Sequence, residues 1–386
     1  MKIELHLIQN FAPSCLNRDD TNQPKDCEFG GVRRARISSQ CIKRATRLFF
    51  RENGSCDIGS RTKRLKQILM EKVEGTGSSK DELPGALDVF LETYYSQMDS
   101  KRPDETAVLL YIGEPEINEA AKCVKDLWAN LTAAAAPVAE GKAGKKKADR
   151  PSLKRDPQIT ERLKAAGPSP DIGLFGRMLA EFPDMNFDAA AQVAHAISTH
   201  RVDMDMDFYT AVDDLNPASE TGAGMMGVTG FNSACFYRYA LIDRAQLLDN
   251  LKDESLTDEV IKAFLLASVH AIPTGKQNSM AAQNLPSFGM FVVRSSGAPC
   301  SLVNAFAEPV RTILGKDEDL IGRSIAALTG YWARMQRVYG SDGVLGTPLF
   351  HDGREERLGA LASSDKGSVQ DAVTATMEAV RAAKGG

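Results

Sequence analysis

Alternation of apolar and polar residues marks the beginning of the chain. Lys2–Gln9 reads KIELHLIQ, and a period of two is typical of a strand with one buried face. Turn-forming Asn, Asp and Pro residues follow between Ser14 and Phe29. From Gln40 onward the apolar residues recur at intervals of three and four, which indicates a helix. The chain is therefore predicted to open with a strand, a loop and a helix.

Helical spacing returns further along the chain. Leu65–Val73 and Gly85–Tyr95 carry apolar residues at three- and four-residue intervals, so this region is predicted to be helical. A helix is also expected over Ala189–Thr199. Gly289–Arg294 reads as a strand, and residues 321–339 predict a long amphipathic helix.

Two stretches interrupt these patterns. Ala133–Pro157 is rich in Ala, Gly, Lys and Pro and is expected to be a mobile loop. Its run Lys145, Lys146 and Lys147 either touches nucleic acid or only keeps the loop solvated. The second stretch, Asn216–Gly230, is rich in glycine and lies between two segments of strand character, which suggests a hairpin.

Acidic residues alternate with apolar ones just before the glycine-rich stretch. Asp203, Asp205 and Asp207 are separated by Met204 and Met206. A calcium-binding EF-hand is rejected because it would need glycine at position 208, where the chain has Phe. The alternation predicts a strand with one acidic and one apolar face.

Composition places the chain among ordinary globular proteins. Its 386 residues are 43% hydrophobic and 25% charged, with a formal charge of −4. Neither a long apolar run nor a signal-peptide pattern is present, so a cytoplasmic protein is expected. Seven cysteines without a CxxC pair predict reduced thiols and no zinc ribbon. No cofactor is expected.

One segment departs from this acidic background. Phe29–Arg47 contains many cations and no acidic residue. Ser38 and Ser39 stand where a helix cap is expected, and the helix that follows would gather its basic residues on one face. A phosphodiester is the ligand that suits such a helix, although a solvated basic face is the alternative. The cations and the amide involved are Arg33, Arg34, Gln40, Lys43, Arg44 and Arg47, with Arg18 and Lys25 in the preceding loop.

Catalytic signatures are absent from the sequence apart from one acidic pair. No GxSxG or HExxH motif occurs, and His195 and His200 are expected to be structural. Asp19 and Asp20 lie beside the basic segment. They would either hold a divalent metal for cleavage of RNA or orient the neighbouring arginines.

Several strings, in the same order along the chain, resemble the CasC family, the CRISPR RNA-binding backbone subunit of type I-E Cascade. PSCLNRDD, FGG, RISSQ and KRA fall within residues 13–45. Two longer strings, AHAISTHRVDMDMDFYTAVDDL and FYRYALI, occupy Ala194–Leu215 and Phe236–Ile242. Only a variable middle part of the chain lacks such similarity.

This resemblance implies an α+β fold with an RRM-like (ferredoxin-like) core, a helical insertion and a protruding β-hairpin thumb. The expected parts are a palm made of residues 1–56, 171–200 and 233–386 with the C-terminal helices, an insertion over 57–170 with its mobile loop at 133–157, and a thumb over 201–232.

The resemblance also assigns roles to individual residues. The basic residues above, with Arg177 and Met178 of the GRM string, would hold CRISPR RNA. Met225, Met226 and Val228 would form the apolar wedge of the thumb. Asp203, Asp205 and Asp207 are expected to contact the next subunit, and Lys145–Lys147 the target strand.

A non-catalytic protein is expected on this basis. Its partners would be CRISPR RNA, target DNA through guide pairing, further copies of itself, the end-capping, large and small subunits, the guide-processing endonuclease and a helicase-nuclease. Two alternatives stay open: a metal-dependent ribonuclease that uses Asp19 and Asp20, and a scaffold whose basic helix binds an acidic protein.

Overall fold

The computed structural model describes residues 1–73, 81–136, 153–215, 223–311 and 319–383, and it divides the chain into two compact units. The first unit contains residues 1–53, 191–244 and 258–386, and the second contains residues 54–190 and 245–257. Among the described residues, no helix combines the length and the apolar character needed to cross a bilayer.

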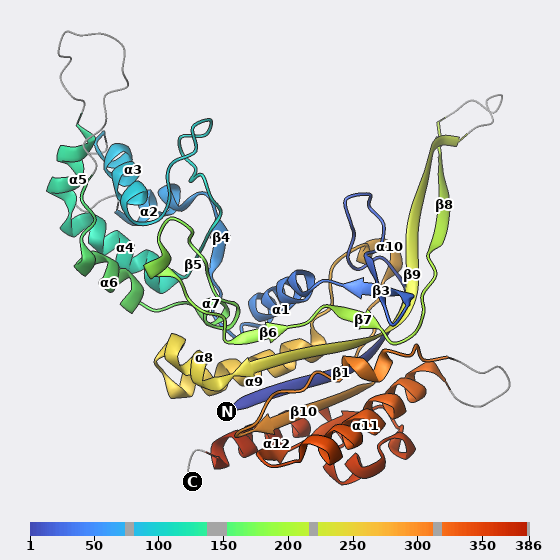
Figure 1. The fold of residues 1–386 in the computed structure, drawn as a ribbon. Helices are drawn as coiled ribbons and strands as arrows, with labels where there is room; N and C mark the ends of the chain where they lie inside the picture. Colours follow the sequence, from blue (N-terminus) through green and yellow to red (C-terminus); the bar gives the residue numbers. More distant parts are fainter. Residues whose placement is uncertain (74–80, 137–152, 216–222, 312–318, 384–386) are drawn as a thin grey trace. The chain divides into compact units, whose positions relative to one another are not determined.

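An antiparallel sheet forms the centre of the first unit (Figure 1). Its main path runs β11-β10-β1-β9-β7-β3-β2, with β12 beside β10 and both β6 and β8 beside β9. The strands are β1 (Lys2–Ser14), β2 (Asp26–Phe29), β3 (Val32–Ile37), β6 (Ala191–Val193), β7 (Ala196–Ser198), β8 (Asp205–Val212), β9 (Ala223–Asp243), β10 (Phe288–Arg294), β11 (Val344–Gly346) and β12 (Leu349–His351). The prediction of an α+β fold is confirmed.

Helices cover both faces of this sheet. Those of the first unit are α1 (Ser39–Asn53), α10 (Gln277–Met280), α11 (Leu320–Tyr339) and α12 (Val369–Ala382), and α9 (Glu254–His270) belongs to it from Asp258 onward. Short 3-10 turns lie at Val303–Phe306, Glu355–Arg357 and Gly359–Ser364. The predicted strand at 289–294 and the long helix at 321–339 correspond to β10 and α11.

Strand β1 is buried on both faces, which corrects the prediction of a single buried face. Leu5 and Leu7 face α1 and α9. On the other side the ring of His6 lies near Trp332 of α11, tilted against it, with ring centroids 6.5 Å apart. Glu4 is also buried and forms an ion pair with Arg294 at 2.9 Å. Glu4 and His6 alternate with apolar residues because each has a buried partner, not because one face meets water.

The segment predicted as a helix over Ala189–Thr199 forms β6 and β7 instead. Ala191 to Val193 pair with β9, and Ile197 pairs with both Arg36 of β3 and Tyr237 of β9. Its alanine content favours a helix locally, but these ladder bonds decide the conformation.

The second unit is mainly helical. Its elements are α2 (Leu65–Val73), α3 (Leu83–Tyr94), α4 (Glu114–Asp126), α5 (Trp128–Ala135), α6 (Pro157–Ala165), α7 (Pro170–Phe175), a 3-10 turn (Pro183–Met185), most of α8 (Arg244–Leu251) and a two-stranded sheet of β4 (Ser60–Thr62) and β5 (Leu110–Ile112). Phe90, Tyr94 and Val124 lie in its core. The unit extends to Ala190. Within it, Asn250 of α8 donates hydrogen bonds to the carbonyls of Gly173 and Asp188, at 2.8 Å each.

Candidate nucleic-acid interface

Helix α1 presents the basic face that its spacing predicts. The N–H of Cys41 donates to the Ser38 hydroxyl at 3.3 Å, so Ser38 caps the helix. Ile42, Ala45 and Phe50 are buried on the inner side. Residues of the predicted basic face point the other way: Gln40 and Arg44 are exposed, and Lys43 and Arg47 are half-buried. The helix is therefore anchored by its apolar face while cations reach the surface.

The loop before the sheet edge is tied to the start of this helix. Asn17 accepts a hydrogen bond from the N–H of Ser38 at 2.8 Å through its side-chain oxygen. Its backbone carbonyl accepts from the N–H of Lys25, also at 2.8 Å. Arg18 is exposed and donates to the side chain of Asn22 at 2.6 Å. These bonds fix the loop cations Arg18 and Lys25 close to α1.

A third segment completes the surface around these residues. Pro273, Thr274 and Gly275 line a polar hollow of about 450 Å³ together with Arg18 and Arg44. A side chain at Gly275 would meet the carbonyl oxygen of Leu16 at 2.3 Å, so only glycine permits this close approach. The sequence offered one signal for this segment, the polar stretch PTGKQN. We call the surface of loop 15–25, α1 and residues 273–275 the basic hollow.

Asp19 holds its own loop together. Its carboxylate accepts hydrogen bonds from the N–H of Gln23 at 2.9 Å and from the hydroxyl and N–H of Thr21 at 2.8 and 2.9 Å. These bonds, first that from Gln23, lower the pKa of Asp19. Asp20 is exposed. Within the described residues, no three His, Cys, Asp or Glu side chains come together as a metal site requires.

Two of the expected RNA ligands in the basic segment lie on β3, not on the helix. Arg33 is exposed and pairs with Asp26 at 3.0 Å. Arg34 is fully buried, and its guanidinium donates to the carbonyls of Phe29, Ser198 and Phe306 at 3.1, 3.1 and 2.7 Å. The expectation that Arg34 binds RNA is therefore corrected, because the side chain joins backbone segments inside the unit.

The GRM string, in the second unit, divides into a buried and an exposed residue. Arg177 forms an ion pair with Glu116 at 2.5 Å, with side-chain exposures of 2% and 1%. Its guanidinium also donates to the carbonyls of Tyr111 and Met185. A nucleic acid has no access to Arg177, which corrects that expectation. Met178 is 81% exposed and is available for a contact.

The two predicted structural histidines have partners inside the first unit. His195 contacts Arg36 at 3.0 Å through Nδ1, and burial, then the charge of Arg36, lowers its pKa. His200 accepts from the N–H of Cys235 at 3.3 Å. Both histidines therefore act as neutral partners of neighbouring groups.

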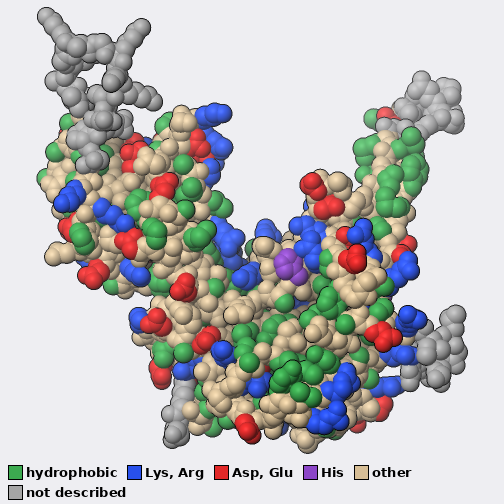
Figure 2. Space-filling view, in the orientation of Figure 1, with side chains coloured by type: hydrophobic (Ala, Val, Ile, Leu, Met, Phe, Trp, Pro, Cys, Tyr) green, Lys and Arg blue, Asp and Glu red, His purple; other side chains and the backbone are tan. Residues whose placement is uncertain are grey.

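An exposed two-stranded ribbon extends from the same sheet. β8 pairs with the first part of β9, from Asp205 opposite Phe231 to Val212 opposite Ala223. Figure 2 shows hydrophobic side chains gathered along it. The large exposed ones are Met206, Phe208, Tyr209, Val212, Met225, Met226 and Val228. Asp203, Asp205 and Asp207 are exposed at its base and along β8, and Asp203 pairs with Arg201 at 3.0 Å.

The lysine run Lys145–Lys147 lies outside the described residues. The roles expected for it, for the ribbon methionines and for the three aspartates stay predictions. Sequence reasoning missed Asn17, whose importance depends on its contact with Ser38. An Asn in a turn-rich loop is the only local signal that it leaves.

Comparisons with known proteins give one family and two similar structures. The sequence profile of the CT1975-like protein family matches residues 3–375. A solved structure titled "CRISPR RNA-guided surveillance complex, pre-nicking" shares 29% identity with a TM-score of 0.81, covering 97% of this chain and 100% of that one. Another, titled "CRISPR RNA-guided surveillance complex", shares 25% identity with a TM-score of 0.74, covering 98% and 100%. No curated protein sequence matches the chain.

Proposed function

The chain belongs to the CT1975-like protein family, and on that premise we propose that it is an RNA-binding backbone subunit of a type I-E CRISPR surveillance complex, of the CasC kind. The similarity to chains of RNA-guided surveillance complexes over nearly the whole length supports this proposal. Several copies would line up along one CRISPR RNA in the cytoplasm.

The observation that carries the proposal is the basic hollow. Arg18 and Arg44 line it, and Lys25, Lys43 and Arg47 stand beside it on the same loop and helix. Cations and helix N–H groups suit phosphate oxygens, which carry no information on base identity. A guide must be accepted whatever its spacer sequence, so backbone contacts of this kind fit the task. Sequence recognition is then left to pairing between guide and target DNA.

The exposed apolar ribbon supplies a second element of the mechanism. A soluble chain that leaves Met225, Met226 and Val228 exposed is expected to cover them in an assembly. In our proposal the ribbon wedges between bases of the guide and reaches the next copy. Its acidic residues Asp205 and Asp207 would meet that copy, since a head-to-tail filament joins two different surfaces.

We propose no catalytic role for the chain. The carboxylate of Asp19 accepts hydrogen bonds within the turn that positions Arg18. This arrangement favours a role in orienting the arginines over metal-assisted cleavage of RNA. Target destruction would fall to a separate helicase-nuclease, and the end-capping, large and small subunits and the guide-processing endonuclease would complete the complex. Met178 would contact bases from the second unit.

Co-purification with RNA tests the proposal. The chain is expressed with its neighbouring genes and a CRISPR array, and the nucleic acid that it retains is sized and sequenced. We expect RNA of uniform length with repeat and spacer, lost in the Lys43→Glu, Arg47→Glu variant and retained in Lys262→Glu, Arg381→Glu, which reverses two exposed cations elsewhere. Nucleic-acid-free wild-type protein would contradict the proposal and favour the scaffold that binds an acidic protein.

A further inference from the structure

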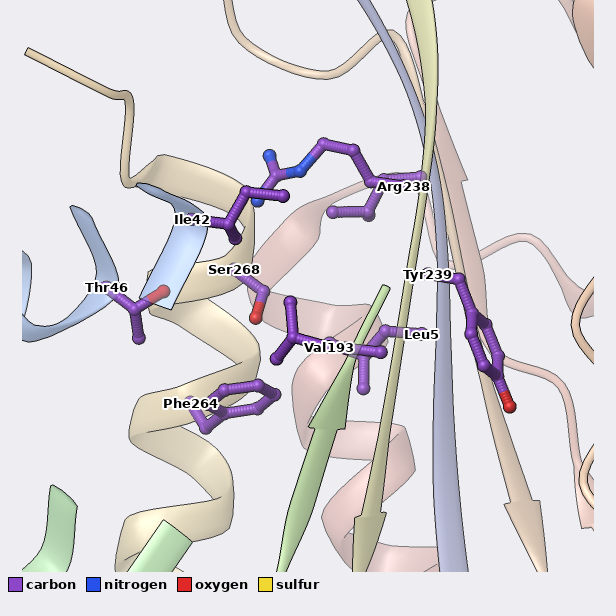
Figure 3. Close-up of a pocket in the computed structure, with 10 residues that line it drawn as sticks. Leu5, Ile42, Thr46, Val193, Arg238, Tyr239, Phe264 and Ser268 are labelled. Carbon is purple, nitrogen blue, oxygen red and sulfur yellow. The ribbon is translucent and has the colours of Figure 1, made fainter. Parts of the chain in front are cut away.

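A small cavity lies behind helix α1, on the side away from its basic face (Figure 3). Residues of α1, α9, β1, β6 and β9 line it. The cavity volume is about 20 Å³. A volume of roughly 10–15 Å³ is enough to hold one molecule the size of water. Its walls are mostly apolar, with Leu5, Leu7 and Phe264 among them.

Arg238 of β9 contributes an unusual charge to this cavity. The residue is only 8% exposed. Its guanidinium carries five N–H donors, and Nη1 donates to the side-chain oxygen of Gln9, a neutral partner, at 2.6 Å. Among the described residues no carboxylate lies within ion-pair distance of it, and burial lowers the pKa of Arg238 to about 10. A buried cation without a counter-ion is costly, so the fold is expected to supply one.

Two hydroxyl groups line the same cavity. Thr46 of α1 and Ser268 of α9 are both buried. Figure 3 shows Arg238 at one end of this space, with Thr46 and Ser268 on the helices beside it. The cavity therefore combines one positive charge with two O–H donors inside an apolar wall.

We propose that this cavity holds a small monovalent anion of chloride size, between the guanidinium of Arg238 and the hydroxyls of Thr46 and Ser268. A bound cation is disfavoured by the charge of Arg238, and the space is too small for a phosphodiester. Because Thr46 lies on the inner face of α1, the anion would fasten that helix to α9 and the sheet. This site is separate from the basic hollow and does not depend on RNA binding.

Bromide substitution tests the site directly. In crystals of the full chain grown in bromide, this ion is expected to replace chloride. It should then give an anomalous peak within hydrogen-bond distance of Arg238. A peak that fits water, without anomalous signal, would overturn the proposal.

Thermal unfolding gives a second test in solution. At equal ionic strength, chloride should raise the Tm of the wild-type chain above its value in gluconate, by about 2 °C for a concentration near ten times the Kd. The Thr46→Val, Ser268→Ala variant should lose this difference. The control Thr376→Val, which removes a buried hydroxyl bonded to the carbonyl of Ala372, should keep it. An equal Tm of the wild-type protein in chloride and in gluconate would contradict the proposal. This test does not need an Arg238→Met variant, which could fail to fold.

Discussion

The side-chain oxygen of Asn17 accepts the N–H of Ser38 at 2.8 Å, and this bond joins the loop that carries Arg18 to the first turn of α1. It links two groups of cations without being charged itself. Asn17, although uncharged, is therefore expected to control RNA affinity by fixing the position of the loop cations relative to α1.

Asn17→Ala should weaken RNA binding several-fold, because the loop cations lose their fixed position while the net charge stays the same. The lost hydrogen bond should also lower the free energy of unfolding by about 1 kcal/mol. The control is Asn53→Ala at the other end of α1, where the side chain donates to the carbonyl of Phe49. Equilibrium binding to RNA measures the effect, and equal affinities of the two variants would contradict it.

Arg44→Ala should remove one phosphate contact from the basic hollow. The slope of log affinity against log salt should then fall in magnitude by about 0.7, the value for one contact to a single strand. Two RNAs of unrelated sequence should be affected equally, since no base is read. Arg381→Ala, a truncation of an exposed arginine on α12, should leave the slope unchanged. A loss confined to one RNA sequence would argue for base recognition instead.

Truncation of Arg177 should affect stability before RNA binding. Arg177→Met leaves Glu116 buried without its partner, which should cost about 3–5 kcal/mol of unfolding free energy. The double variant Arg177→Met, Glu116→Leu should recover most of this loss, because both charges are gone. Urea unfolding measures both variants, and a single variant as stable as wild type would contradict the structural role.

His6 should make stability depend on pH. Burial, then the charge of Arg294, lowers the pKa of His6 to about 3 from 6.5. Below pH 6.5 the unfolded chain therefore binds a proton that the folded chain does not, so stability falls as the pH falls toward 3, by at most about 1.4 kcal/mol per pH unit. Above pH 6.5 this residue contributes no slope.

His6→Leu provides the comparison for that dependence. The variant loses the contact of His6 with the Tyr237 hydroxyl at 2.9 Å, so its absolute stability changes as well. The informative quantity is the difference in slope between the two proteins, measured by urea unfolding between pH 4 and 6. Parallel curves for wild type and variant would show that His6 does not titrate as described.

Charge reversal on the ribbon should separate assembly from RNA affinity. Asp205→Lys with Asp207→Lys should reduce the length of the multimer formed on RNA, while single-copy affinity stays the same or rises. Asp81→Lys with Glu82→Lys, an equal change on exposed residues of the second unit, should leave multimer length unchanged. Native mass spectrometry counts the copies, and full-length multimers of the ribbon variant would contradict a subunit contact there.

Local patterns in the sequence predicted several elements. Helices α1 and α11 lie where spacing indicates, because periodic apolar residues specify which side is buried. Strand β10, buried at every residue, follows from its short apolar run. The hairpin of β8 and β9 was also visible from alternation and glycine content. Gln40 and Arg44 were correctly expected at the surface for the same reason.

Long-range partners explain what the sequence did not reveal. Arg34 looks like the other basic residues of its cationic run, and Arg177 looks like an isolated surface arginine. Carbonyls and a carboxylate far away in the chain surround them. The segment Ala189–Thr199 forms strands because β3 and β9 offer ladder partners. Strand partners of this kind are far apart in the sequence and meet only in the folded sheet, so a short stretch of sequence does not reveal them.

Ultraviolet crosslinking of the assembled complex tests the central claim most directly. RNA bound in the cell is crosslinked to the protein, and the modified peptides are identified by mass spectrometry. The account predicts crosslinks within residues 15–25, 39–47 and 273–275 for guides of unrelated sequence, and none to the buried Arg34. Crosslinks confined to α11 and α12, or absent from the basic hollow, would contradict it.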